Sequence, residues 1–125
     1  MDREAAGRLF RTAWITGVRK HYPGKPKDGY VASWEDMPDW ERQSAQAVAE
    51  VVVRFVEESG SGTAKLTREQ RGQFVATAWL AQMYKHFSDP KPSYVSPWAD
   101  LPAWQQETDS DIFTVIEQAV RTESN

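Results

Sequence analysis

The chain has 125 residues, of which 26% are charged and 40% hydrophobic, and its formal net charge is −3 at pH 7. This length and composition suit a single globular domain, and no apolar run approaches transmembrane length. The absence of cysteine excludes disulfides, thiolate metal sites and thiol nucleophiles, and the acidic balance does not favour a binder of duplex nucleic acid. Because no secretory signal is recognised, we expect a cytoplasmic protein with no membrane partner.

The first half predicts a helix, a loop and a second helix. Apolar residues recur at three- and four-residue steps over residues 2–20, which predicts a helix with Asp2 as its N-cap. The Pro- and Gly-rich residues 22–29 predict an ordered loop. A second helix is expected from about Asp36 to Glu58, with Asp36 as a cap and Pro38 in its first turn. Its predicted buried stripe is Trp40, Ser44, Ala47, Val48, Val51, Val52 and Phe55.

The second half predicts the same order of elements after a flexible connector at residues 59–62. Thr67 and Gln70 match a capping box, which starts a third helix ending near Phe87. A fourth helix carries apolar residues from Trp104 to Val120, and Asp100 is interpreted as its cap. Glu107, Asp109 and Asp111 are interpreted as a solvated acidic helix start, in which Asp109 and Asp111 cannot share a face. Strand signals are weak, so the predicted fold class is all-α.

The two halves repeat one another in sequence. Residues 7–14 (GRLFRTAW) return as residues 72–79 (GQFVATAW), and residues 30–40 (YVASWEDMPDW) return as residues 94–104 (YVSPWADLPAW). A period this long indicates a supersecondary unit copied whole. We expect repeat 1 at about residues 2–58, a linker at 59–66 and repeat 2 at 67–122. A pseudo-twofold within one domain spanning residues 1–125 would bring equivalent residues of the two copies together.

The segments 34–45 (WEDMPDWERQSA) and 98–109 (WADLPAWQQETD) give the chain a family resemblance. It resembles the ryanodine-receptor repeat (RyR domain), in which a tryptophan-bearing helix leads to a proline-containing loop, a Leu-Pro pair and an acidic helix start. The helix tryptophan matches at Trp14 and Trp79. Met37 replaces the leucine in the first copy, and the Gly-Trp, Gly-Pro and His-Pro steps of the family's central loop are not matched. The resemblance implies a non-catalytic module of the small bacterial or phage type, linked to nucleotide-like ligands.

The equivalent tryptophans Trp14 and Trp79 are the leading candidates for a binding site. Two indoles that face each other across a cleft can sandwich a planar base. Aromatic residues at helical spacing are also ordinary core residues, so packing between the two halves is the alternative interpretation.

Basic residues recur in both copies near the candidate tryptophans. Lys20 and Lys85 end the first helix of each copy beside a histidine, where they complement the helix dipole or contact a phosphate. Lys25 and Lys91 lie in proline-stiffened loops beside Tyr30 and Tyr94. Such a loop either binds an anionic group or is simply solvated.

The sequence contains no recognisable catalytic or metal-binding pattern. We find no nucleophile–base pair, no phosphate-cradling glycine loop and no zinc spacing, so we expect no catalytic residues, no metal and no cofactor. The first hypothesis is a ligand-binding or sensing module that holds a nucleotide-like small molecule between the repeats. The alternative is a protein-interaction module, or a homo-oligomer, that docks through its Trp-rich loops.

Overall fold

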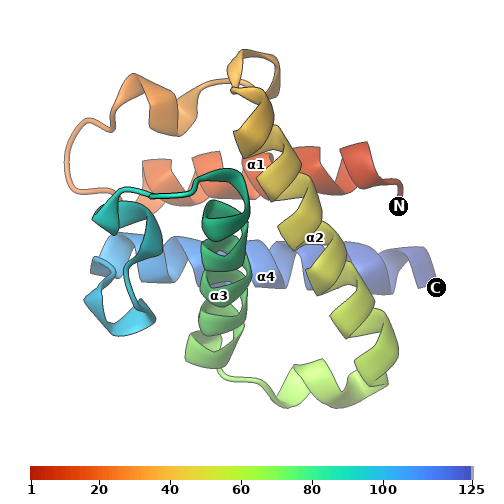
Figure 1. Ribbon diagram of the computed structural model, residues 1–125. Coiled ribbons are helices and arrows are strands. Elements are labelled where there is room, and N and C mark those ends of the chain that lie inside the picture. The colour runs from red at the N-terminus through yellow and green to blue at the C-terminus, as the bar shows by residue number, and fades with distance from the viewer. Residues whose placement is uncertain (125) are drawn as a thin grey trace.

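The computed structural model describes residues 1–124, and all of their regular structure is helical (Figure 1). The four long helices are α1 (Arg3–His21), α2 (Asp39–Ser59), α3 (Arg68–His86) and α4 (Ala103–Ser124). Short 3-10 helices occupy the connections: η1 (Asp28–Val31), η2 (Trp34–Asp36), η3 (Gly60–Lys65), η4 (Pro92–Val95) and η5 (Trp98–Asp100). The predicted all-α fold is confirmed.

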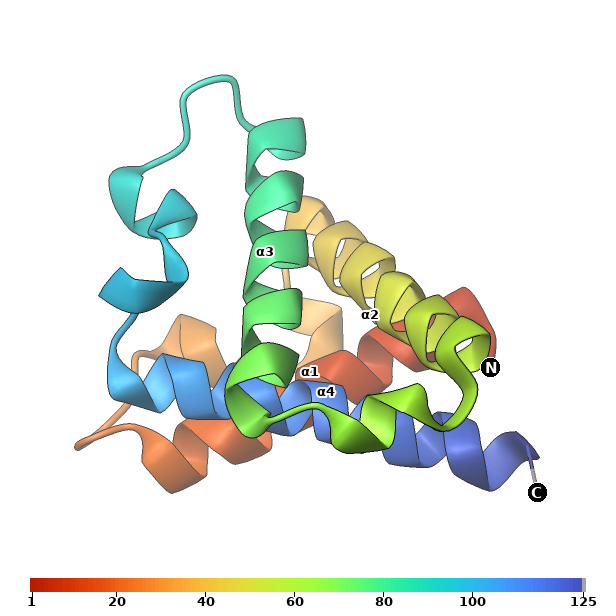
Figure 2. The ribbon, with the colours of Figure 1, turned by 90° about the horizontal axis from the view of Figure 1, so that it is seen from below.

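Each half shows the same order of elements, a long helix, two 3-10 helices and a second long helix, and η3 joins the halves. The long loops between the helices of each half lie on the same side of the molecule in both Figure 1 and Figure 2. This order agrees with a duplicated unit. The pseudo-twofold relation between the halves stays a prediction.

The predicted N-terminal caps are present on two of the long helices and absent from the other two. Asp2 caps α1 by accepting from the Ala5 amide at 2.7 Å, and the capping box between Thr67 and Gln70 is present at the start of α3. The predicted cap at Asp36 is wrong, because the N-cap of α2 is Pro38. The residue before a proline is held in extended backbone, so the helix begins only after Pro38.

Asp36 and Asp100 instead belong to the short helices η2 and η5. The Asp36 carboxylate accepts from the Ser33 hydroxyl at 3.0 Å. Asp100 ends η5, three residues before α4 begins, so its predicted role as the cap of α4 is also wrong.

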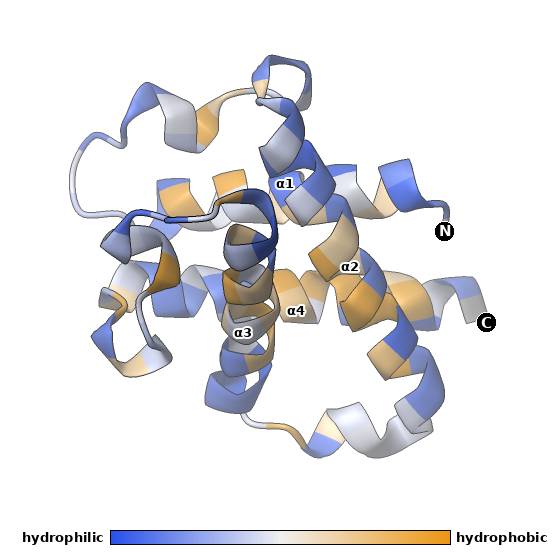
Figure 3. Cartoon of the chain, viewed as in Figure 1, coloured by the Kyte–Doolittle hydropathy of each residue, from blue (hydrophilic) through white to orange (hydrophobic). Residues whose placement is uncertain are grey.

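The core draws on all four long helices. α1 and α4 run side by side in opposite directions, and α2 and α3 pack across them (Figures 1 and 2). Hydrophobic residues gather where α2, α3 and α4 meet (Figure 3). The largest fully buried apolar side chains are Val18, Val48, Val52, Val75, Met83, Ile112, Phe113 and Ile116. Val51 was expected in the buried stripe of α2, but it is 47% exposed, because the stripe runs through Ala45, Ala49 and Val56.

Two glycines let the loop tryptophans approach the helices closely. A Cβ on Gly7 would lie 2.7 Å from Trp34 Cη2, and a Cβ on Gly72 would lie 2.4 Å from Trp98 Cη2. These tryptophans begin η2 and η5, so each loop is folded back onto the first helix of its own half. No helix within residues 1–124 combines the length and the apolar character needed to cross a membrane.

Candidate ligand-binding site

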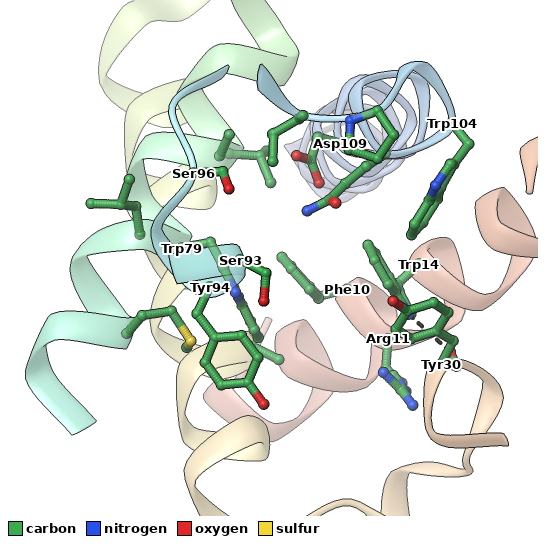
Figure 4. Close-up of a pocket in the computed structure, with 18 of the residues that line it drawn as sticks. Phe10, Arg11, Trp14, Tyr30, Trp79, Ser93, Tyr94, Ser96, Trp104 and Asp109 are labelled. Carbon is green, nitrogen blue, oxygen red and sulfur yellow. Dashed lines mark hydrogen bonds between the residues drawn. The ribbon is translucent and has the colours of Figure 1, made fainter. Parts of the chain in front are cut away.

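A pocket of about 430 Å³ opens between the two halves, and all four long helices and both long loops contribute to its wall (Figure 4). Several wall residues occupy equivalent positions in the two copies. The equivalent pairs include Trp14 and Trp79, Tyr30 and Tyr94, Met37 and Leu101, and Trp40 and Trp104. This volume is in the range of small-molecule sites.

Two aromatic clusters contribute to the pocket. The first aromatic cluster joins Tyr22 and Tyr30 of the first loop to Trp104 of α4, with ring centroids 4.9 and 5.6 Å from the Trp104 ring. The second aromatic cluster joins Phe87 and Tyr94 of the second loop to Trp40 of α2, at 5.0 and 6.0 Å. In each cluster the tryptophan comes from the opposite half. A pseudo-twofold would produce this exchange.

A third aromatic residue stands between Trp14 and Trp79, which were expected to face each other across a ligand. Both indoles line the pocket, but Phe10 lies between them in Figure 4 and stacks on Trp79 at 5.7 Å and 16°. Trp14 packs edge-on against Trp104 and Tyr30, at 5.8 and 6.2 Å. Phe10 therefore prevents a ligand from being sandwiched directly between the two indoles.

The opposite sides of the pocket are nevertheless aromatic. Figure 4 shows Trp14, Tyr30 and Trp104 on one side and Trp79 and Tyr94 on the other. The predicted residues Tyr30 and Tyr94 are thus both in the wall.

The structure places the predicted lysines unevenly around the pocket. Lys91 holds its ammonium 5.6 Å from the centre of the Tyr94 ring. The equivalent contact in the first copy is made by Lys27, 5.8 Å from the Tyr30 ring, and Lys27 lines the pocket. None of the four predicted lysines is among the wall residues, and all four are exposed: Lys20, Lys25, Lys85 and Lys91.

Arg11 fixes the first loop against α1. Its guanidinium is 4% exposed and donates to the carbonyls of Gly29 and Ala32 at 2.9 Å, with Glu41 3.5 Å away. The Trp14 indole N–H donates to the Tyr30 carbonyl at 2.9 Å. Burial raises the pKa of Glu41, and Arg11 opposes this rise. Arg11 is thus occupied by the protein itself, although it lines the pocket.

The prediction of a solvated acidic helix start is wrong for Asp109. This residue is 6% exposed and lines the pocket, whereas Glu107 is exposed. Burial raises the pKa of the Asp109 carboxyl well above its usual range. Asp109 lies one helical turn after Gln105 and so shares its face of α4, which lines the pocket.

The other charged groups of this region form ion pairs away from the pocket. Asp111 accepts from His21 and from Arg68, both at 2.9 Å, and so ties α4 to α1 and α3. Burial raises the pKa of Asp111, but the hydrogen bonds from His21 and Arg68 outweigh burial and leave that pKa below its usual range. Across residues 1–124, no cluster of three or more His, Asp or Glu side chains has the arrangement needed to hold a metal ion.

Five wall residues were not among the predicted site residues, although three of them carried a signal. Lys27, Trp40 and Trp104 each have an equivalent of the same type at the 64-residue offset that identified Tyr30 and Tyr94. Arg11 and Asp109 had no such signal, because their equivalents are Ala76 and Ala45. A difference between copies at a buried position would have identified these two.

Comparison of the chain with family models, with curated proteins and with solved structures returns no match. The similarity to the ryanodine-receptor repeat therefore stays a prediction.

Proposed function

We propose that this chain is a non-catalytic binding or sensing module that takes a planar, nucleotide-like ligand in the pocket between its two halves. The observation that carries the proposal is a cavity of about 430 Å³ with aromatic side chains on opposite sides. Base–aromatic stacking contributes about 1–3 kcal/mol of binding per base. A planar heterocycle fits such a site better than a branched aliphatic ligand does.

The two lysines over the tyrosine rings supply a place for an anionic group. Lys27 and Lys91 lie at equivalent positions of the two loops, and both are exposed. Their ammonium groups contact phosphate as point charges, whereas the Arg11 guanidinium already donates to the first loop. A phosphate at the mouth of the pocket and a base within it is the arrangement we propose.

The alternative of a docking surface formed by the Trp-rich loops has less support. Trp34 is 8% exposed and Trp98 is partly buried, and both pack on glycines of their own half. This packing leaves the loop tryptophans little area for a partner protein.

Fluorescence titration of the parent protein with AMP and GMP tests the proposal. We expect saturable quenching, which Trp104→Phe weakens about fivefold because phenylalanine retains only part of the stacking area. The matched control is Trp98→Phe, which changes a tryptophan outside the pocket wall and leaves the affinity unchanged. Absence of quenching by both nucleotides, or an equal loss in the control, would contradict the proposal.

A further inference from the structure

Asp109 has no polar partner among the described residues. Its side chain is 6% exposed, and no described side chain or backbone group makes a hydrogen bond or an ion pair with its carboxyl group. The other buried acid of α4, Glu117, is paired with Arg71 at 3.3 Å and with Arg121 at 3.5 Å. Asp109 instead faces the pocket, between its two aromatic sides (Figure 4).

The first copy of the repeat has no acid at the equivalent position. Ala45 is the equivalent of Asp109, is fully buried and also lines the pocket. The preceding residues have kept their role in both copies, because Ser44 and Thr108 donate to the carbonyls of Trp40 and Trp104 at 2.8 and 2.7 Å. A buried carboxyl without a partner lowers stability, so packing alone does not account for Asp109.

We propose that Asp109 selects the ligand by accepting two adjacent N–H donors from the edge of a guanine-type base. This inference rests on the proposed function. It adds the class of base and the residue that recognises it.

The choice of an aspartate indicates an edge with two donors. An ionised carboxylate offers acceptors only, whereas an asparagine offers one donor and one acceptor without a buried charge. An asparagine side chain would pair with a base edge that has one donor and one acceptor, such as that of adenine. Guanine carries a ring N–H beside an amino group, and both can donate to one carboxylate.

The cations in the pocket wall favour a neutral base over a cationic group with the same donor pattern. Arg11 and Lys27 both line the wall, and Arg11 is paired with Glu41. The positive charge of Lys27, unpaired among the described residues, disfavours an amidinium or guanidinium ligand.

Calorimetric titration with GMP, IMP and AMP measures this selectivity directly, because the three share a ribose and a phosphate and differ in the base edge. We expect the parent to bind GMP at least about tenfold more tightly than IMP, which lacks the amino group that donates to the charged acceptor. Asp109→Asn should weaken GMP binding by at least about tenfold and shift the preference toward AMP. The control Asp100→Asn, on an exposed residue of η5, should bind all three as the parent does.

Each outcome separates this inference from the proposed function. If AMP or IMP binds the parent as tightly as GMP, or if Asp109→Asn binds GMP normally, Asp109 does not select the base and the pocket remains a site for planar ligands. If none of the three nucleotides binds, the proposed function fails as well. Asp109→Ala introduces the residue that the first copy has at this position. A cooperative thermal melt of this variant shows that a loss of affinity does not come from misfolding.

Discussion

At the scale of single residues, close packing against the loop tryptophans, and not helix propensity, explains why positions 7 and 72 are glycine. Replacement of a helical glycine by alanine ordinarily stabilises a helix by about 1 kcal/mol. Here the new Cβ of Gly7→Ala would lie 2.6 Å from Gln46 Cγ and 2.7 Å from Trp34 Cη2. Overpacking costs about 1–3 kcal/mol, so we expect a net loss of up to about 2 kcal/mol in the free energy of unfolding.

Urea denaturation of Gly7→Ala and Gly72→Ala measures this loss. Gly62→Ala is the control, because the nearest atom to its added Cβ is 3.9 Å away, in Ser59. An increase in the denaturation midpoint of Gly7→Ala would show that Trp34 has room to move.

The contributions of Asp109 and Asp111 to stability are expected to change in opposite directions with pH. Burial raises the pKa of Asp109, so its unfavourable contribution grows as pH rises from about 4, the usual pKa of an aspartate, through the raised value. We expect Asp109→Asn to be more stable than the parent at pH 7, with the difference shrinking toward pH 4. Thermal melts across this pH range measure the difference, and a constant difference would contradict the raised pKa.

Asp111 is the matched comparison for this pH series. The hydrogen bonds from His21 and Arg68 hold the pKa of Asp111 below its usual range despite its partial burial. Its contribution is therefore present above about pH 4 and is lost as pH falls through the lowered pKa. We expect Asp111→Asn to be less stable than the parent at pH 7, opposite in sign to Asp109→Asn.

At the scale of elements, the two long loops are held unequally. Arg11 and Trp14 donate hydrogen bonds to the backbone of the first loop. Their equivalents on α3 are Ala76 and Trp79, and within residues 1–124 no side chain of α3 donates to the second loop. We expect the amides of residues 88–97 to exchange with solvent faster than those of residues 24–33, as measured by hydrogen–deuterium exchange. Equal exchange would mean that the second loop is held as firmly without side-chain donors from α3.

The sequence predicted the long helices well because their signals are local. Apolar spacing, the Asp2 cap and the Thr67 capping box each depend on residues within one turn of one another. The cap of α2 was misplaced, because the extended backbone before Pro38 outweighed the preference of Asp36 for a cap position.

The candidate site was predicted only where the two copies agree. Repetition identified Trp14, Trp79, Tyr30 and Tyr94, all of which line the pocket. The stacking of Phe10 on Trp79 and the burial of Asp109 depend on how helices from different halves pack together. The ion pair of His21 with Asp111 joins residues 90 positions apart, so no local pattern could identify it.

At the scale of the whole molecule, the two halves share one hydrophobic core. α1 packs on α4, and α2 packs on α3, where the Phe55 and Phe74 rings stack at 4.6 Å. A fragment of residues 1–60 would expose both of these surfaces and lose too much apolar burial to offset its chain entropy. We expect circular dichroism of this fragment to show little cooperative melting. A sharp independent transition would contradict a shared core.

The two ends of the described chain lie close together, with the Met1 amino group 3.3 Å from Glu123 Oε2. Because η3 alone connects the halves, a circular permutant that joins these ends through a short Gly-Ser bridge and opens the chain near Gly62 would place α3 and α4 before α1 and α2. We expect this permutant to fold to the same helix packing and to keep the pocket. Adjacent ends also make the chain suitable for insertion into a surface loop of a host protein. Ligand binding to the inserted chain would then be measured as a change in the activity or fluorescence of the host.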